Sequence, residues 1–132
     1  MNLGVAGWVL DTAPLLEFAD GSSYARAVTS AARRHGLTLL VPIGALAEAY
    51  AIRRDSRQRQ RLQPIRDEHE MWVLSLPSEV HAPDWERYAT LADGDRTAGH
   101  VAVLAALRGW PIVTDRDQLF HRVIPGVQIV PA

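Results

Sequence analysis

Apolar residues occur along the chain in short continuous runs that alternate with segments of helical spacing. The runs lie at residues 7–10, 37–42, 71–76, 111–114 and 127–130. A short apolar run bounded by polar or turn residues is typical of a strand buried on both faces of a parallel sheet. The pattern predicts five strands, the last of them at an edge of the sheet.

Helical spacing and cap signals occupy the segments between these runs. Ser22 or Ser23 begins a predicted helix that ends at Gly36, and Asp95 begins another that ends at Gly109. Further helical segments are predicted for a short turn after residue 11, for 43–50, for 83–93 and for a short turn at 119–120. Strands that alternate with helices predict an α/β fold, a three-layer α/β/α sandwich with a mostly parallel sheet of about five strands.

Composition adds a domain count and several exclusions. With 132 residues, 48% apolar and 22% charged, the chain is expected to form a single domain over residues 1–132. It has no cysteine, which excludes disulfides, thiolate nucleophiles and cysteine-ligated metals. No apolar run has the length of a membrane span, and the start lacks an export signal, so we expect no membrane association and a cytoplasmic location.

Charge is nearly balanced overall but locally basic. The net charge is −1, and all fourteen cationic side chains are arginine. Arginine suits phosphate and base recognition, although a GC-rich genome also explains the bias. Six arginines lie within residues 53–66, where they either follow a phosphate backbone or form a solvated helix face. The candidate RNA-binding residues are Arg53, Arg54, Arg57, Arg59 and Arg61.

Acidic residues follow the predicted strands. Asp11 ends the first strand and Asp115 and Asp117 follow the fourth, while Glu48 and Asp95 lie in neighbouring helical segments. The carboxyl ends of parallel strands share one edge, so these carboxylates are expected to converge there. A hard divalent cation such as Mg²⁺ resolves their repulsion, and such a site typically serves phosphoryl transfer.

Each of these residues also has a structural interpretation. Asp11 can cap the helical segment that follows it, and Glu48 can point to solvent. His100, within an apolar helix, is more often a hydrogen-bonded core histidine than a ligand. These alternatives stay open from the sequence alone.

The ordered set of motifs resembles the PIN domains, in particular the toxin-type ribonucleases of prokaryotic toxin–antitoxin pairs. The matching segments are Val9-Leu10-Asp11-Thr12, Val41-Pro42 followed by Leu46-Ala47-Glu48-Ala49-Tyr50, Leu107-Arg108-Gly109-Trp110-Pro111-Ile112-Val113-Thr114-Asp115 and Pro125-Gly126-Val127. The resemblance implies a PIN-like five-stranded sandwich and a Mg²⁺- or Mn²⁺-dependent endoribonuclease. It also implies an RNA substrate, an antitoxin protein partner and a homodimer.

The resemblance assigns the acidic positions unevenly. Asp11 and Glu48 match the first two acidic positions of the family. At the third position this chain has Ala98, with Asp95 one turn earlier. At the fourth it has Arg116, an internal cation that competes with a metal ion.

Two functional hypotheses follow, besides a small α/β protein whose acids are caps and surface charges. In the first, Asp11, Glu48 and Asp115 are catalytic in a metal-dependent endoribonuclease. Its metal ligands are drawn from Asp11, Glu48, Asp95, Asp115 and Asp117. In the second, the chain is a catalytically degenerate PIN-like module that binds RNA or a protein.

Local geometry ranks the uncertain ligands. Asp115 directly follows a predicted buried strand and is expected to face the same edge as Asp11, whereas Asp117 lies further into a loop. Asp95 has a competing role as a helix cap. If the acids repel one another, Asp11→Asn is expected to remove activity and leave stability nearly unchanged.

Aromatic content predicts self-association. Trp72, Trp85 and Trp110 offer more aromatic surface than a small core absorbs, which favours a homodimer.

Overall fold

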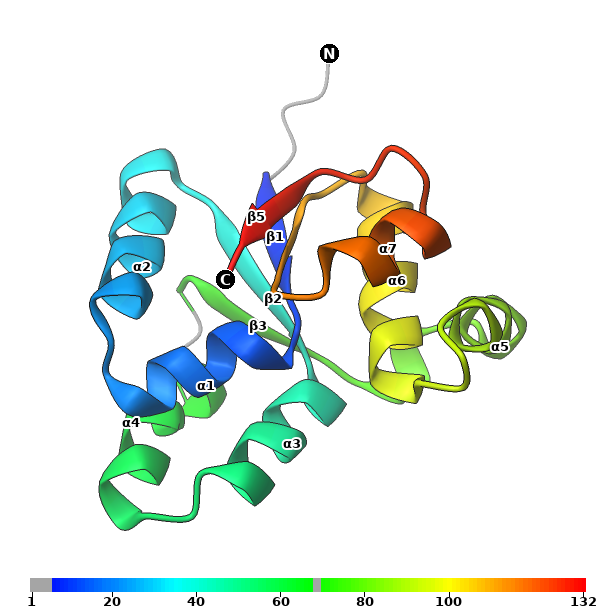
Figure 1. Cartoon of the computed structure of the whole chain (residues 1–132). Helices are drawn as coiled ribbons and strands as arrows, with labels where there is room; N and C mark the ends of the chain where they lie inside the picture. Colours follow the sequence, from blue (N-terminus) through cyan, green and yellow to red (C-terminus); the bar gives the residue numbers. More distant parts are fainter. Residues whose placement is uncertain (1–5, 68–69) are drawn as a thin grey trace.

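The computed structural model describes residues 6–67 and 70–132, and it contains one five-stranded sheet (Figure 1). The strands are β1 Gly7–Leu10, β2 Thr38–Pro42, β3 Trp72–Ser75, β4 Ile112–Thr114 and β5 Ile129–Pro131. Their order is β3-β2-β1-β4-β5, and every neighbouring pair is parallel. The carboxyl ends of β1 and β4 are therefore adjacent at the centre of one sheet edge.

Helices connect the strands and cover both faces of the sheet. They are α1 Thr12–Asp20, α2 Ser23–His35, α3 Ile43–Ile52, α4 Ser56–Asp67, α5 Ala82–Leu91, α6 Arg96–Arg108 and α7 Asp117–Val123, with a short 3₁₀ helix at Pro77–Glu79. Figure 1 shows α1, α2 and α4 on one side of the sheet and α6 and α7 on the other. This is the predicted three-layer α/β/α arrangement.

Side chains along each strand point alternately to the two faces of the sheet, where they form two hydrophobic cores. Leu10 and Val41 pack with apolar residues of α1, α2, α3 and α4. Their neighbours Val9 and Leu40 pack with residues of α6 and α7 on the opposite face. Because successive strand residues point to opposite faces, a continuous apolar run supplies both cores.

Local signals explain where the long helices begin and end. Ser22 accepts a hydrogen bond from the backbone of Ala25 at 3.2 Å and caps α2, as predicted. Gly109 ends α6 with φ 67°, a conformation that favours glycine. Gly99 allows α5 to approach α6, because a Cβ at this position would lie 2.8 Å from Ala89.

The sequence-based prediction of an α/β sandwich with about five strands is confirmed, with differences at several ends. The segment after Asp11 is a nine-residue helix rather than a short turn. The last helical turn extends to a full helix over Asp117–Val123, and the edge strand lies at Ile129–Pro131. Within the described residues, no helix is long and apolar enough to cross a bilayer.

Candidate acidic site and a neighbouring arginine pocket

Asp11 lies at the carboxyl end of β1 and is almost completely buried, with a relative exposure of 1%. Its Oδ2 accepts hydrogen bonds from Thr114 Oγ1 at 2.8 Å and from Arg116 Nε at 2.9 Å, and its Oδ1 accepts one from Arg116 Nη2 at 2.8 Å. Asp11 occupies the N-cap position of α1, but its side chain makes no cap hydrogen bond. The carboxylate is committed to Thr114 and Arg116 instead.

Arg116 joins two carboxylates. Besides the two bonds to Asp11, its Nη1 donates to Asp95 Oδ2 at 2.6 Å. The backbone N–H of Arg116 donates to Thr114 Oγ1 at 2.9 Å, which directs the arginine back over the end of β1. The guanidinium fork matches carboxylate geometry, and bidentate pairs of this kind are the stronger class of ion pair.

The electrostatics of the cluster favour the charged forms of its members. Burial lowers the pKa of Arg116, but hydrogen bonds and charges from Asp11 and Asp95 outweigh it, so its pKa lies above the ordinary value. Burial raises the pKa of Asp95, but the Ala98 N–H and then Arg116 more than compensate, so its pKa lies below the ordinary value. Arg116 therefore offsets one of the two negative charges of Asp11 and Asp95.

Asp95 also has the predicted structural role. Its side chain accepts a hydrogen bond from Ala98 N at 2.9 Å and caps α6. One carboxylate oxygen thus serves the helix and the other serves Arg116. The cap prediction for Asp95 is confirmed.

Glu48 lies on α3 at the same edge of the sheet and has neutral partners. Thr12 Oγ1 donates to its Oε2 at 2.8 Å, and Thr97 Oγ1 donates to its Oε1 at 2.7 Å. Glu48 therefore bridges the first turns of α1 and α6, the helices that follow Asp11 and Asp95. Glu48 is exposed, which agrees with the interpretation that it points to solvent, but its two threonine partners were not predicted from the sequence.

Asp115 and Asp117 are placed differently from Asp11. Both are exposed, and they flank Arg116 without forming a hydrogen bond to Asp11. The Thr114 hydroxyl accepts the N–H of Arg116, so the arginine is the side chain after β4 that reaches Asp11. The contacts of Asp11 involve Thr114 and Arg116 rather than Asp115, and the ranking of Asp115 as a metal ligand stays a prediction.

The acidic residues as arranged do not fit a divalent cation. Asp11 and Asp95 share one guanidinium, and both oxygens of Glu48 accept threonine hydroxyl groups. Among residues 6–67 and 70–132, no group of three acidic, histidine or cysteine side chains is positioned to hold a metal ion. An ion at this edge would have to displace Arg116, because Mg²⁺ and Mn²⁺ need the same carboxylate oxygens.

His100 is a core residue. It is 2% exposed, its Nε2 lies 3.1 Å from Ser75 Oγ, and its ring centre is 5.0 Å from that of Trp85. Burial lowers the pKa of His100, and the nearby charge of Glu79 opposes this effect only in part. The interpretation of His100 as a satisfied core histidine is confirmed.

The predicted RNA-binding arginines divide into two groups. Arg53 forms an ion pair with Asp20 at 2.8 Å, Arg59 donates to the Tyr50 carbonyl at 2.8 Å, and Arg61 donates to the Ala19 carbonyl at 3.0 Å. Arg59 and Arg61 connect α4 to α3 and α1, and Arg53, which follows α3, connects the end of α3 to α1. Arg54 and Arg57 are exposed.

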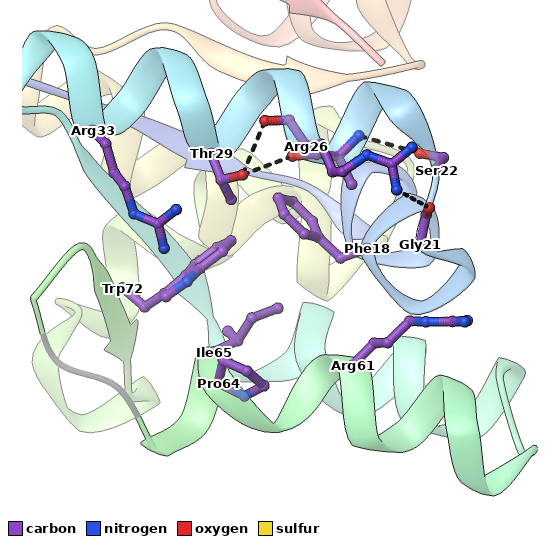
Figure 2. Close-up of a pocket in the computed structure, with 11 residues that line it drawn as sticks. Phe18, Gly21, Ser22, Arg26, Thr29, Arg33, Arg61, Pro64, Ile65 and Trp72 are labelled. Carbon is purple, nitrogen blue, oxygen red and sulfur yellow. Dashed lines mark hydrogen bonds between the residues drawn. The ribbon is translucent and has the colours of Figure 1, made fainter.

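A pocket that sequence reasoning missed lies between α2 and α4, with a volume of about 360 Å³ (Figure 2). Phe18, Ile65 and Trp72 form an apolar floor, and Arg26, Arg33 and Arg61 stand around it. The available sequence signal is the spacing of Arg26 and Arg33, since residues seven apart share one face of a helix. Arg61 and Trp72 join them only through the fold.

Comparisons with known proteins give no family assignment. No family model matches the chain, and no curated protein matches it.

Proposed function

We propose that this chain is a PIN-like domain that binds RNA without cleaving it. The proposal rests on the hydrogen bonds of Arg116. Its Nε and Nη2 donate to the two carboxylate oxygens of Asp11, and its Nη1 donates to Asp95. A guanidinium at this position neutralises the carboxylates that a nuclease of the resembled family would use for its metal ion. The acidic residues at this sheet edge then stabilise the fold rather than bind a metal ion.

Exposed arginines support binding to an anionic partner. Arg54 and Arg57 are exposed in the basic segment, and Arg26 and Arg33 are exposed on α2. Guanidinium groups bind phosphate oxygens and stack on bases, which suits single-stranded RNA. The near-zero net charge limits non-specific attraction, so we expect moderate affinity with a clear salt dependence.

A Mg²⁺- or Mn²⁺-dependent endoribonuclease is the second candidate. It is favoured by the placement of Asp11, Glu48 and Asp95 around one sheet edge, linked through Thr12 and Thr97. Arg116 is 32% exposed at its side chain and follows a strand end, so its departure needs no rearrangement of the core. In this candidate Asp11, Glu48 and Asp115 are the catalytic residues.

Binding and cleavage assays separate the two candidates. A fluorescent single-stranded RNA is titrated with the protein in EDTA, in Mg²⁺ and in Mn²⁺, and the same samples are run on a denaturing gel. We expect equal affinity in all three conditions and intact RNA. Metal-dependent cleavage that Asp11→Asn removes would establish the nuclease instead, and absence of binding would reject the RNA-binding function.

The location proposal comes from the sequence, and the partner proposals come from the resemblance and the aromatic content. We propose action in the cytoplasm, as a homodimer and with an antitoxin-like protein partner. Trp72 is only 4% exposed and packs edge-on against Phe18 with ring centres 5.0 Å apart, so it supplies no surface for a dimer. The more exposed apolar side chains are Leu107 at 69% and Ile52 at 53%.

A further inference from the structure

We infer that the pocket between α2 and α4 binds one phosphorylated nucleotide, with the base on the apolar floor and the phosphate on the arginines. This inference deepens the proposed RNA-binding function and rests on it for the source of the nucleotide. The pocket lies on the α1, α2 and α4 side of the sheet (Figures 1 and 2). None of the acidic-edge residues lines it.

The size and the floor of the pocket suit a single planar ligand. Its volume of about 360 Å³ lies at the lower end of the range for small-ligand sites. Phe18 and Trp72 meet edge to face at 82°, and Ile65 lies beside them, so the floor is rigid and apolar (Figure 2). Phe18 is the partly exposed ring of this floor, whereas Trp72 is 4% and Ile65 2% exposed, so an unstacked base would contact chiefly Phe18.

The charge around the pocket selects an anion. Three arginines line it, and no acidic residue in the described part of the chain does so. Arg26 donates to the Gly21 carbonyl at 3.3 Å and Arg61 to the Ala19 carbonyl at 3.0 Å, and each contact uses one Nη1 atom. The other guanidinium nitrogens of these two residues are left for phosphate oxygens.

The arginines lie at the two ends of the pocket, where they would contact two different parts of the ligand. Figure 2 shows Arg26 and Arg61 at one end of the pocket, near Gly21, and Arg33 at the other end, above Trp72. The paired arginines fit a phosphate group, which accepts several charge-assisted hydrogen bonds. Arg33 fits the base, because a guanidinium plane stacks on a nucleobase, and the buried Trp72 closes the pocket beneath it.

Two hydroxyl groups in the lining bond to the backbone of α2. Ser22 Oγ accepts the Ala25 N–H and caps the helix, and Thr29 Oγ1 donates to the Ala25 and Arg26 carbonyls at 3.2 and 3.1 Å. Of the two, only the Ser22 hydroxyl keeps its proton for a ligand, so recognition depends mainly on charge and apolar contact. We expect little discrimination between bases.

The test measures binding of adenosine 5′-monophosphate by calorimetry to the full chain. We expect saturable binding, with adenosine and inorganic phosphate each binding at least about tenfold more weakly. Arg33→Ala is expected to weaken binding about tenfold, whereas Arg34→Ala, an exposed neighbour outside the pocket, leaves it unchanged. Thr29→Phe, which fills the pocket without removing charge, is expected to prevent binding.

Further ligands identify the source of the nucleotide. A short RNA with a 5′-phosphate that binds more tightly than its 5′-hydroxyl form, in an Arg33-dependent way, indicates an RNA end, and preference for the free nucleotide indicates a small-molecule site. If RNA binds but neither Arg33→Ala nor Thr29→Phe changes any affinity, the pocket inference is overturned and the proposed function stands. If the nucleotide binds and RNA does not, the proposed RNA-binding function is rejected and the pocket inference stands. Arg33-dependent binding of an acidic peptide, without nucleotide binding, would also overturn the inference.

Discussion

Arg116 and Asp11 are 105 positions apart in the chain and form a two-point ion pair, with Nε and Nη2 at 2.9 and 2.8 Å from the two carboxylate oxygens. The pair joins the residue after β1 to the second residue after β4. Because Asp11 is 1% exposed, its charge would be costly without this partner. The contact therefore stabilises the edge at which the resembled family places its catalytic acids.

Removal of the arginine is expected to destabilise the fold. Arg116→Ala leaves Asp11 buried without its cation; because the Arg116 side chain is 32% exposed, we expect a loss of about 2–3 kcal/mol, below the roughly 3–5 kcal/mol of a fully buried pair. The measurement is the free energy of unfolding in urea at pH 7. Arg122→Ala is the matched control, because Arg122 pairs with Asp93 on the surface, and such pairs contribute up to about 1 kcal/mol. Equal effects of the two variants would contradict a structural role for Arg116.

Replacement of Asp11 is expected to act in the same direction. A cluster of repelling acids would make Asp11→Asn neutral or stabilising, whereas the observed pair makes it destabilising, because the guanidinium loses its main counterion. A lowered melting temperature, with a smaller loss in the double variant Asp11→Asn with Arg116→Ala than the sum of the single losses, supports the pair. Additive losses would indicate independent roles.

Asp95→Ala is expected to cost stability through two contacts. Loss of the cap on α6 costs about 1 kcal/mol, and loss of one bond to Arg116 adds to it. Asp95→Asn keeps a cap acceptor and separates the two contributions. A melting temperature for Asp95→Ala that equals that of the parent would contradict both contacts.

Stability is expected to depend on pH through His100. Its pKa in the folded protein lies below the ordinary value because it is buried, so the unfolded chain binds a proton more readily. The stabilising effect is present above about pH 6.5 and is lost as the pH falls below that value. Urea unfolding between pH 8 and pH 5 measures the slope, and His100→Gln is expected to flatten it. If the free energy of unfolding of His100→Gln depends on pH as steeply as that of the parent, other groups cause the pH dependence.

The predictable parts of this protein are those that depend on neighbouring residues. Apolar runs predict the strands, and the Asp95 cap depends on a backbone N–H three residues away. The Asp11–Arg116 pair is different, because the Thr114 hydroxyl turns the chain after β4 so that Arg116 faces Asp11. The positions of acidic residues after the predicted strands give no indication of this turn of the chain.

The arginine pocket also could not be predicted from neighbouring residues alone. Arg26 and Arg33 share a helix face that can be recognised in the sequence, but Arg61 and Trp72 come from α4 and β3. Packing of α2 and α4 against the sheet brings these four side chains together. The basic run from residue 53 lies at the surface, but Arg53, Arg59 and Arg61 also bond to neighbouring helices, which the sequence did not indicate.

Calorimetric titration of the parent protein with Mn²⁺ at pH 7 shows whether the acidic edge binds a metal ion. We expect no binding at millimolar metal and no change in melting temperature, because Arg116 already occupies the carboxylates of Asp11 and Asp95. Stoichiometric Mn²⁺ binding that raises the melting temperature and is abolished by Asp11→Asn would contradict it.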